Sequence, residues 1–395
     1  MAAAELTTTD LPTVAFVLPT RNRPGQLATT LERIAAVGAG PSWRAIVVDN
    51  ASSPPAHAPK YLRDRVEVVR LNGNRGTAAR NIGVRRAGPG AAWIVMLDDD
   101  SWPIDAGFLA ALRDMPDDVG AVMADVWLEP DADGNPRRES GGLPEVFVGC
   151  GVAIRREAYL ALGGYDASFG YYAEEYDLAA KLLMAGWRTV FDDRFRVRHA
   201  KVEAGRDMNA ILGRLVRNNG WVIQRYAPDA QLAERLAENE RRYREIAERE
   251  DALAGYEAGL AELGATIASQ LRTPMSEPQW DRFTGVAAAR VALGRAAEAA
   301  PMRTAAVVER GKNAWAVERA LAEVGVAMVD EPAAADAVVI GTMSPGPMLD
   351  AAARWRGRHE RVIVPWVSAA EVAGMEPVAV AAAKQEDARG VDRAA

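Results

Sequence analysis

Short apolar runs alternate with stretches of helical spacing through the first 200 residues of the chain. The runs predict strands at 14–18, 44–48, 66–71, 92–97 and 121–128. Between them, apolar positions three and four residues apart predict helices at 26–37 and 77–86. Strands separated by helices indicate βαβ units, so the pattern predicts an α/β fold with a right-handed, mostly parallel sheet.

The next part of the chain begins with turn-forming residues at 129–144, which predict a mobile loop. After this loop, apolar spacing predicts further helices at 157–162, 174–185 and 207–226 and a strand at 189–192. We therefore expect one domain over 12–228.

The last third of the chain has a different pattern of charged and apolar residues. Charge-dense sequence with helical spacing predicts a helical hairpin or one long helix at 229–272, within a helical segment 229–300 that offers a surface for homo-oligomerisation. Short apolar runs around a predicted helix at 315–324 indicate a small α/β module over 301–370. The Ala-rich end, 371–395, predicts a flexible tail.

Composition narrows the class of protein. The chain has 395 residues, 49% of them hydrophobic and 26% charged, which fits a globular protein of more than one domain. A formal charge of −7 argues against nucleic-acid binding. A single cysteine, Cys150, suits a reducing cytosol and reads as a small packing residue. The sequence has no apolar stretch near the ~20 residues of a spanning helix and no signal-peptide pattern, so we expect a cytoplasmic protein.

Three adjacent carboxylates, Asp98, Asp99 and Asp100, follow the apolar run at 93–97 directly. Open α/β sheets bind ligands just past the carboxyl ends of their strands. A divalent cation that shares oxygen ligands with phosphate would offset the mutual repulsion of the three acids. The same acids would also suit a solvated turn that caps a helix starting near Pro103, with Ser101 as a further cap candidate. Taken alone, the triplet leaves both interpretations open.

Several short motifs follow one another in a recognisable order. They are VLPTRNR at 17–23, VVDNAS at 47–52, NRGTAARN at 74–81, MLDDD at 96–100, GCG at 149–151, GGYD at 163–166 and EEYDL at 174–178. Their order and spacing resemble those of the family 2 inverting glycosyltransferases, which have the GT-A fold. The resemblance covers residues 12–228 and does not reach the C-terminal third.

The resemblance implies a nucleotide-sugar donor site. The positions that match the family's nucleotide-binding residues are Pro19, Thr20, Arg21 and Asp49. Arg80 and Asn81 match a pair that lies near the nucleotide-sugar pocket, and a guanidinium can bind phosphate bidentately. Without the resemblance, Asp49 would be read as part of a turn and Arg80 as one of several arginines on an exposed helix.

The resemblance also implies a metal site. Asp98 would contact the donor ribose or the metal, Asp99 would lie beside the donor, and Asp100 would bind the ion. His199 matches a histidine that completes this site in several branches of the family. The expected cofactor is Mn²⁺ or Mg²⁺, although imidazole is not the preferred ligand of magnesium.

An acidic pair at a predicted helix start, Glu174 and Glu175, supplies the candidate general base. Inversion requires a base that takes the proton of the acceptor hydroxyl, and the second member of the pair fills that role in the family, so we expect Glu175. Asp177 is the second candidate. Acids in a first helical turn also complement the helix dipole, which does not exclude catalysis.

Together these residues predict a metal-dependent inverting glycosyltransferase with a UDP- or dTDP-linked donor. The expected acceptor is the hydroxyl of a glycan, a lipid-linked sugar or a natural product, as in polysaccharide biosynthesis. A lipid-linked acceptor would bring peripheral membrane contact. Two alternatives stay open: a sugar-phosphate nucleotidyltransferase, which uses a similar sheet and metal acids, and a non-catalytic scaffold.

Overall fold

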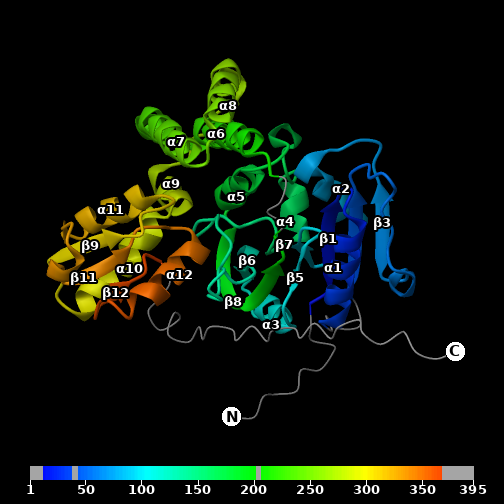
Figure 1. The fold of residues 1–395 in the computed structure, drawn as a ribbon, viewed down its shortest axis with the longest axis horizontal. Coiled ribbons are helices and arrows are strands. Elements are labelled where there is room, and N and C mark those ends of the chain that lie inside the picture. Colours follow the sequence, from blue (N-terminus) through cyan, green and yellow to red (C-terminus); the bar gives the residue numbers. More distant parts are fainter. Residues whose placement is uncertain (1–11, 38–42, 202–205, 367–395) are drawn as a thin grey trace, which may run out of the picture.

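The structure, a computed structural model, describes residues 12–37, 43–201 and 206–366. Within these ranges the chain forms an eight-stranded sheet in its N-terminal half and a four-stranded sheet near its C-terminal end. A group of helices lies between the two sheets in sequence and gathers along one side of the molecule (Figure 1). The predicted flexible tail, 371–395, lies outside the described residues.

The larger sheet has the strand order β3-β2-β1-β4-β7-β6-β8-β5. Its strands are β1 (Val14–Thr20), β2 (Arg44–Asp49), β3 (Val66–Arg70), β4 (Trp93–Met96), β5 (Ser101–Pro103), β6 (Val119–Trp127), β7 (Val152–Arg155) and β8 (Arg188–His199). Strands β1 to β4 are parallel, as are β6 and β8, whereas β7 is antiparallel to both its neighbours and β5 is antiparallel to β8. The predicted α/β class with a mostly parallel central sheet is confirmed.

Helices cover both faces of this sheet. They are α1 (Pro24–Ala36), α2 (Ala79–Arg86), α3 (Gly107–Arg113), α4 (Arg156–Ala161) and α5 (Glu174–Met184). One face packs against α1 and α3, and the other packs against α2, α4 and α5. In β4, Trp93 and Val95 face the first cluster while Ile94 and Met96 face the second. This two-sided burial explains why β4 is apolar at every position.

The helical segment that follows consists of α6 (Met208–Tyr226), α7 (Asp229–Arg249), α8 (Leu253–Thr266), α9 (Glu277–Thr284) and α10 (Val286–Ala299). The charge-dense sequence forms the pair α7 and α8. Tyr243 and Tyr256 of this pair pack on Leu212 and Val216 of α6. Much of the apolar face that suggested self-association therefore contacts the same chain, and homo-oligomerisation through 229–300 stays a prediction. None of the helices in the described ranges combines the length and apolarity that a membrane crossing requires.

The C-terminal module is a small parallel sheet with the order β10-β9-β11-β12. Its elements are β9 (Thr304–Val308), α11 (Ala314–Glu323), β10 (Ala327–Met328), β11 (Ala337–Ile340), α12 (Pro345–Trp355) and β12 (Val362–Ile363).

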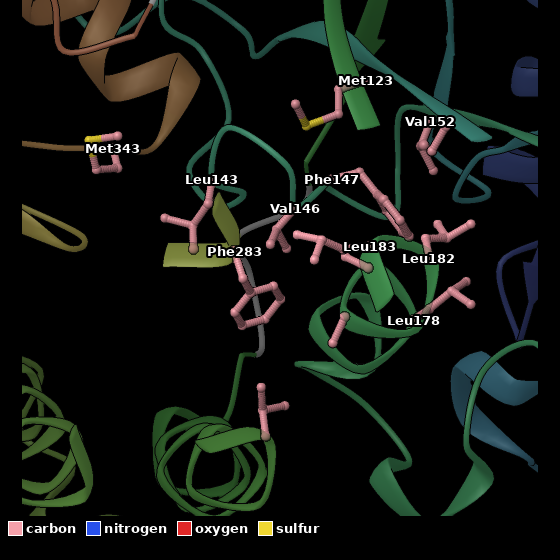
Figure 2. Close-up of a cluster of buried hydrophobic side chains, with 14 of the residues drawn as sticks. Met123, Leu143, Val146, Phe147, Val152, Leu178, Leu182, Leu183, Phe283 and Met343 are labelled. Atoms are coloured by element: carbon pink, nitrogen blue, oxygen red, sulfur yellow. The ribbon is translucent and has the colours of Figure 1, made fainter. Parts of the chain in front are cut away.

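The module shares a hydrophobic core with the larger sheet. Figure 2 shows part of this core, where Met343 of the module and Phe283 of α9 lie toward Leu143, near the end of the 129–144 region, and Val146 just after it, with Leu182 of α5 nearby. All five side chains are buried in one continuous cluster. The apolar surface of the C-terminal module is therefore packed against the N-terminal domain.

Two local expectations are wrong. No helix starts near Pro103, because residues 101–103 form β5 and pair with β8, and α3 begins only at Gly107. Ser101 consequently does not cap a helix: its hydroxyl accepts the Asp98 N–H at 2.9 Å and donates to the Cys150 carbonyl at 3.0 Å. The strand expected at 189–192 continues to His199, because β8 pairs with β6 and then with β5.

Candidate active site

The acidic residues gather at one edge of the large sheet. Thr20 ends β1 and Asp49 ends β2, and the two are aligned in the parallel register. Asp98 follows the neighbouring β4. His199 ends β8, opposite Ser101 of β5. Side chains from four strands therefore meet where the carboxyl ends of the parallel strands β1, β2 and β4 lie, as expected for a ligand site of an α/β sheet.

The repulsion within the Asp triplet is offset by an arginine of this chain. Arg23 donates to Asp99 Oδ1 at 2.6 Å and to Asp100 Oδ2 at 2.8 Å. Asp99 also accepts the Thr20 hydroxyl at 2.7 Å. Burial raises the pKa of Asp99 to about 6, whereas His199 and Arg23 together lower the pKa of Asp100 despite its burial. Asp100 is thus the triplet member that is held most firmly in its charged form beside His199.

A candidate metal cluster forms beside this triplet. Asp98, Cys150 and His199 each offer a ligand atom, and these atoms lie within 4.8 Å of one another. Asp100 Oδ1 lies 3.3 Å from His199 Nε2 and is a buried oxygen without a hydrogen-bond donor among the described residues. Carboxylates are ligands of both Mn²⁺ and Mg²⁺. Imidazole is a less usual ligand of Mg²⁺. The donor set therefore fits a divalent cation.

Cys150 is more than a packing residue. Its Sγ lies 3.6 Å from His199 Nδ1, a contact that the sequence did not indicate. Burial raises the pKa of the Cys150 thiol. The thiol is therefore a direct neighbour of the histidine in this structure.

Glu139, which the sequence did not single out, contacts the same nitrogen of His199 as Cys150 does, across the ring from the nitrogen beside Asp100. His199 Nδ1 lies 2.9 Å from Glu139 Oε2, and Lys201 Nζ lies 2.8 Å from Glu139 Oε1. Although burial opposes it, hydrogen bonds and charges from His199 and Lys201 lower the pKa of Glu139 to about 2. Burial likewise opposes the raised pKa of His199, which Cys150, Asp100 and Glu139 cause. A carboxylate behind a histidine is the usual support of a metal ligand.

The 129–144 region is tied down in its second half, contrary to the expected mobile loop. Besides Glu139, Arg138 pairs with Asp125 at 2.7 Å and with Asp350 of α12 at 2.8 Å. Gly141 N–H donates to the Ser344 hydroxyl at 3.0 Å. These partners lie up to 212 residues away in the sequence, so local turn composition could not reveal them.

Arg80 and Asn81 have different surroundings. Arg80 is buried, pairs with Asp98, and donates to the Leu97 carbonyl at 3.1 Å. Its Nε has no acceptor among the described residues. Asn81 accepts the Tyr165 N–H at 3.0 Å and donates to the Tyr165 carbonyl at 2.8 Å. Arg80 therefore lies in the acidic cluster, whereas Asn81 holds the turn that precedes α5.

The remaining candidate donor-binding residues also lie at this edge. Asp49 is fully buried and accepts from the Ser52 and Ala56 N–H groups at 2.8 and 3.1 Å. Arg70 pairs with the same carboxylate at 3.0 Å, so both oxygens of Asp49 are engaged within the chain. Pro19 lies in β1 opposite Val48, and Arg21 is exposed just beyond the strand.

Glu175 is the second residue of α5, a helix that follows Tyr172 and Ala173, whose φ values are 72° and 65°. The left-handed conformation is costly for residues with a Cβ and is typical of functional sites. A Cβ on Gly149 would lie 2.6 Å from Glu175 Oε1, so the carboxylate is set closely against this glycine loop.

Several charges act on the acidic pair. Burial raises the pKa of Glu175, while Arg80 and Lys312 oppose the shift and Asp98 adds to it. Glu174 is only 1% exposed, and burial together with the Glu175 charge raises its pKa well above the usual value. Burial therefore shifts Glu174 toward its neutral form, whereas the charges of Arg80 and Lys312 oppose that shift at Glu175.

Asp177 is directed away from this cluster. It is fully buried, with Arg225 at 2.8 Å, the Tyr226 hydroxyl donating at 2.7 Å and Lys181 at 2.5 Å. These contacts attach α5 to α6. The structure thus brings Glu175 close to Arg80 and Asp98 but does not bring Asp177 there.

Three residues of the site were missed from the sequence. Arg23 stands inside the VLPTRNR motif, two positions from Arg21, and its motif was the one available signal. Glu139 lies in a segment that reads as a turn, and Lys312 lies outside the region of resemblance. Neither carries a local pattern that points to the site.

The chain was compared with known protein families and solved structures. The family model Glycosyl transferase family 2 matches residues 15–163. Similar solved structures include GalNAc-T7 with UDP, GalNAc and Mn²⁺, with 18% identity, a TM-score of 0.44 and coverage of 66% of this chain and 58% of that one. The mannosyltransferase PcManGT from Pyrobaculum calidifontis, with GDP-Man and Mn²⁺, has 19% identity, a TM-score of 0.43 and coverage of 80% and 87%. Residues 1–349 of TarS from S. aureus have 14% identity, a TM-score of 0.39 and coverage of 69% and 79%.

This chain thus spans 58% of the length of the GalNAc-T7 chain. The comparison with curated proteins found no match. The family model covers β1 to β4, the Asp triplet and Cys150, and it ends before Glu175 and His199. Residues 15–163 match the model of glycosyl transferase family 2, the family that the order of the sequence motifs resembles.

Proposed function

We propose that this protein is a metal-dependent inverting glycosyltransferase, which moves a sugar from a UDP- or dTDP-linked donor to an acceptor hydroxyl. The observation that carries the proposal is the convergence of Asp98, Asp100 and His199 beside Glu175 at one sheet edge. The family model supports the reaction class. Donor base, sugar and stereochemistry are part of the proposal.

On the donor side, guanidinium groups and carboxylates would have different roles. Arg21 and Arg23, just beyond β1, would bind phosphate oxygens of the donor. Thr20 holds Asp99 in place at 2.7 Å, and Arg80 holds Asp98. Asp49, with both oxygens engaged, would shape the loop beneath the nucleotide, next to the turn that Asn81 supports.

Asp98, Asp100 and His199 would hold Mn²⁺ or Mg²⁺, with Cys150 close by. The ion supplies Lewis-acid stabilisation of the charge that develops on the departing diphosphate. Imidazole and thiol groups favour Mn²⁺ over Mg²⁺. Glu139 would keep the His199 ring in one orientation through the 2.9 Å contact.

Glu175 would act as the general base. A base is most effective when its pKa lies near the working pH, and burial raises the pKa of Glu175 in that direction. The charges of Arg80 and Lys312 oppose the rise in the pKa of Glu175. The Glu175 carboxylate would thus still be able to accept a proton from the acceptor. Asp177 is engaged in ion pairs with α6 and α5, which supports Glu175 as the better candidate.

Nucleoside diphosphate release tests the proposal. The enzyme is incubated with UDP- and dTDP-sugars in Mn²⁺, in Mg²⁺ or in EDTA, as wild type and as Glu175→Gln. We expect release that needs the metal and is lost in Glu175→Gln, with donor binding retained. Glu157→Gln, which changes an exposed acid at the start of α4, is the matched control and should behave as wild type.

Two results would favour the other classes of protein. Pyrophosphate released from a nucleoside triphosphate and a sugar phosphate would indicate a nucleotidyltransferase. Absence of donor binding under all metal conditions would favour a scaffold. Cytoplasmic location and peripheral membrane contact stay predictions.

A further inference from the structure

A cavity of about 1070 Å³ lies between the N-terminal domain, α7 and the C-terminal module. The domain contributes Trp127 and Arg138, α7 contributes Arg242, and the module contributes Lys312 and Thr342. The same loop that lines the cavity carries Glu139, which contacts His199. The cavity therefore opens next to the candidate active site, and its size suits a sugar-sized ligand.

The lining of the cavity is cationic in a chain that is acidic as a whole. Seven of the lining residues are arginine or lysine and three are acids, whereas the chain carries a formal charge of −7. Some of these cations are already neutralised: Arg138 pairs with Asp350, Arg310 with Glu318, and Arg354 with Glu309. Arg242 and Lys312 differ from these three in their surroundings.

Arg242 and Lys312 both line the cavity. In the described ranges no carboxylate oxygen lies within 4.0 Å of either cation. Lys312 Nζ instead lies 4.0 Å from the centroid of the Tyr176 ring. Burial and the Arg242 charge lower the pKa of Lys312 to about 7, while Glu175 opposes this shift. A pair of like charges in a cavity is stabilised when an anion binds between them.

The position of Lys312 links the cavity to the candidate base. Lys312 lines the cavity together with Arg242, and its Nζ lies over the ring of Tyr176, the residue that follows Glu175 in α5. An acceptor whose anionic group contacts Arg242 and Lys312 would thus extend toward the Glu175 carboxylate. Lysine and arginine are the usual ligands of phosphate and carboxylate groups.

We propose that this cavity is the acceptor site and that Arg242 and Lys312 bind the oxyanion, a phosphate or a carboxylate, of an anionic sugar acceptor. The assignment as an acceptor site rests on the proposed function. It makes the C-terminal module part of the substrate site, because Lys312 precedes α11 of that module.

Ligand-induced thermal stabilisation tests the binding directly. The full chain is first saturated with UDP and Mn²⁺, so that the donor side is filled, and is then titrated with glucose 6-phosphate, glucuronate or glucose. We expect stabilisation by an anionic sugar and none by glucose. The first two ligands distinguish a phosphate from a carboxylate, and binding of either one supports the proposal.

Variants show where the anion binds. Arg242→Ala and Lys312→Gln should each weaken the apparent affinity on the order of 10- to 100-fold, as for a lost hydrogen bond to a charged group. Lys312→Arg should retain most of it. Arg244→Ala removes the same charge from the same helix, but from an exposed residue that pairs with Glu248, and should bind as wild type.

Three results would overturn the proposal: equal stabilisation by glucose, wild-type affinity in both Arg242→Ala and Lys312→Gln, or an equal loss in Arg244→Ala. Failure of the proposed function gives a different result. In that case no sugar nucleotide is turned over while the anion still binds and depends on Arg242 and Lys312, which supports the anion site. Turnover of a sugar nucleotide without any anion binding overturns this inference alone.

Discussion

Replacing Gly149 with alanine would move the candidate base without removing it. The new Cβ would lie 2.6 Å from Glu175 Oε1, whereas ordinary contact begins at 3.4 Å. The carboxylate must therefore retreat by about 0.8 Å, the difference between these two distances. The Glu175 Cδ and Cγ atoms lie at 3.5 Å and need not move, so rotation of the carboxylate end is the least costly response.

A shift of this size is expected to affect turnover far more than stability. A misplacement of about 1 Å in a catalytic group can cost on the order of 100-fold in rate. Displacing the end of a flexible side chain should cost less than the roughly 1–3 kcal/mol of overpacking in a rigid core. For Gly149→Ala we thus expect kcat to fall on the order of 100-fold, with donor affinity and the free energy of unfolding nearly unchanged.

The assay combines steady-state nucleoside diphosphate release, donor binding and urea denaturation. Gly90→Ala is the matched control, since a Cβ at Gly90 has nothing within 4 Å. If Gly149→Ala keeps wild-type kcat, the position of Glu175 does not limit the reaction and its assignment as the base is refuted. If both variants lose activity equally, the loss has no connection with Glu175.

Three further changes probe other parts of the molecule. Glu139→Gln should weaken Mn²⁺ affinity roughly 10- to 100-fold, as for other residues that support metal ligands, in a Mn²⁺ titration monitored by thermal shift; unchanged affinity would show that His199 needs no such support. Gly259→Ala places a Cβ 2.2 Å from the Gly213 carbonyl oxygen and should lower the free energy of unfolding by roughly 1–3 kcal/mol. Gly264→Ala, in open space on the same helix, should raise the free energy of unfolding by up to about 1 kcal/mol. Urea denaturation that ranks the two variants the other way would contradict the close contact of α6 and α8. The pKa of Lys312 is lowered to about 7 beside Arg242, Tyr176 and Glu175, so the charge of Lys312 is present below that pH and lost above it. The affinity for glucuronate should therefore fall as the pH rises through 7 and should stay level in Lys312→Arg. A level profile in the wild type would exclude Lys312 as the ligand.

Local sequence determined the strands and the edge where the site lies. A strand buried on both faces must be apolar at every position, and 93–96 is such a run. In parallel strands the carboxyl ends meet at one edge, so Asp98 to Asp100 after β4 and Asp49 at the end of β2 were expected to lie near one another. The order of motifs resembled the family whose model matches residues 15–163.

Tertiary structure alone decided how the charges of the site are balanced. Arg23 reaches Asp99 across 76 residues, and Glu139 reaches His199 across 60. Lys312 comes beside Glu175 only because the C-terminal module shares a core with the N-terminal domain. Hydrophobic periodicity reports which face of an element is buried, but it carries no information on which distant side chain will neutralise a buried charge. That choice depends on the packing of whole elements.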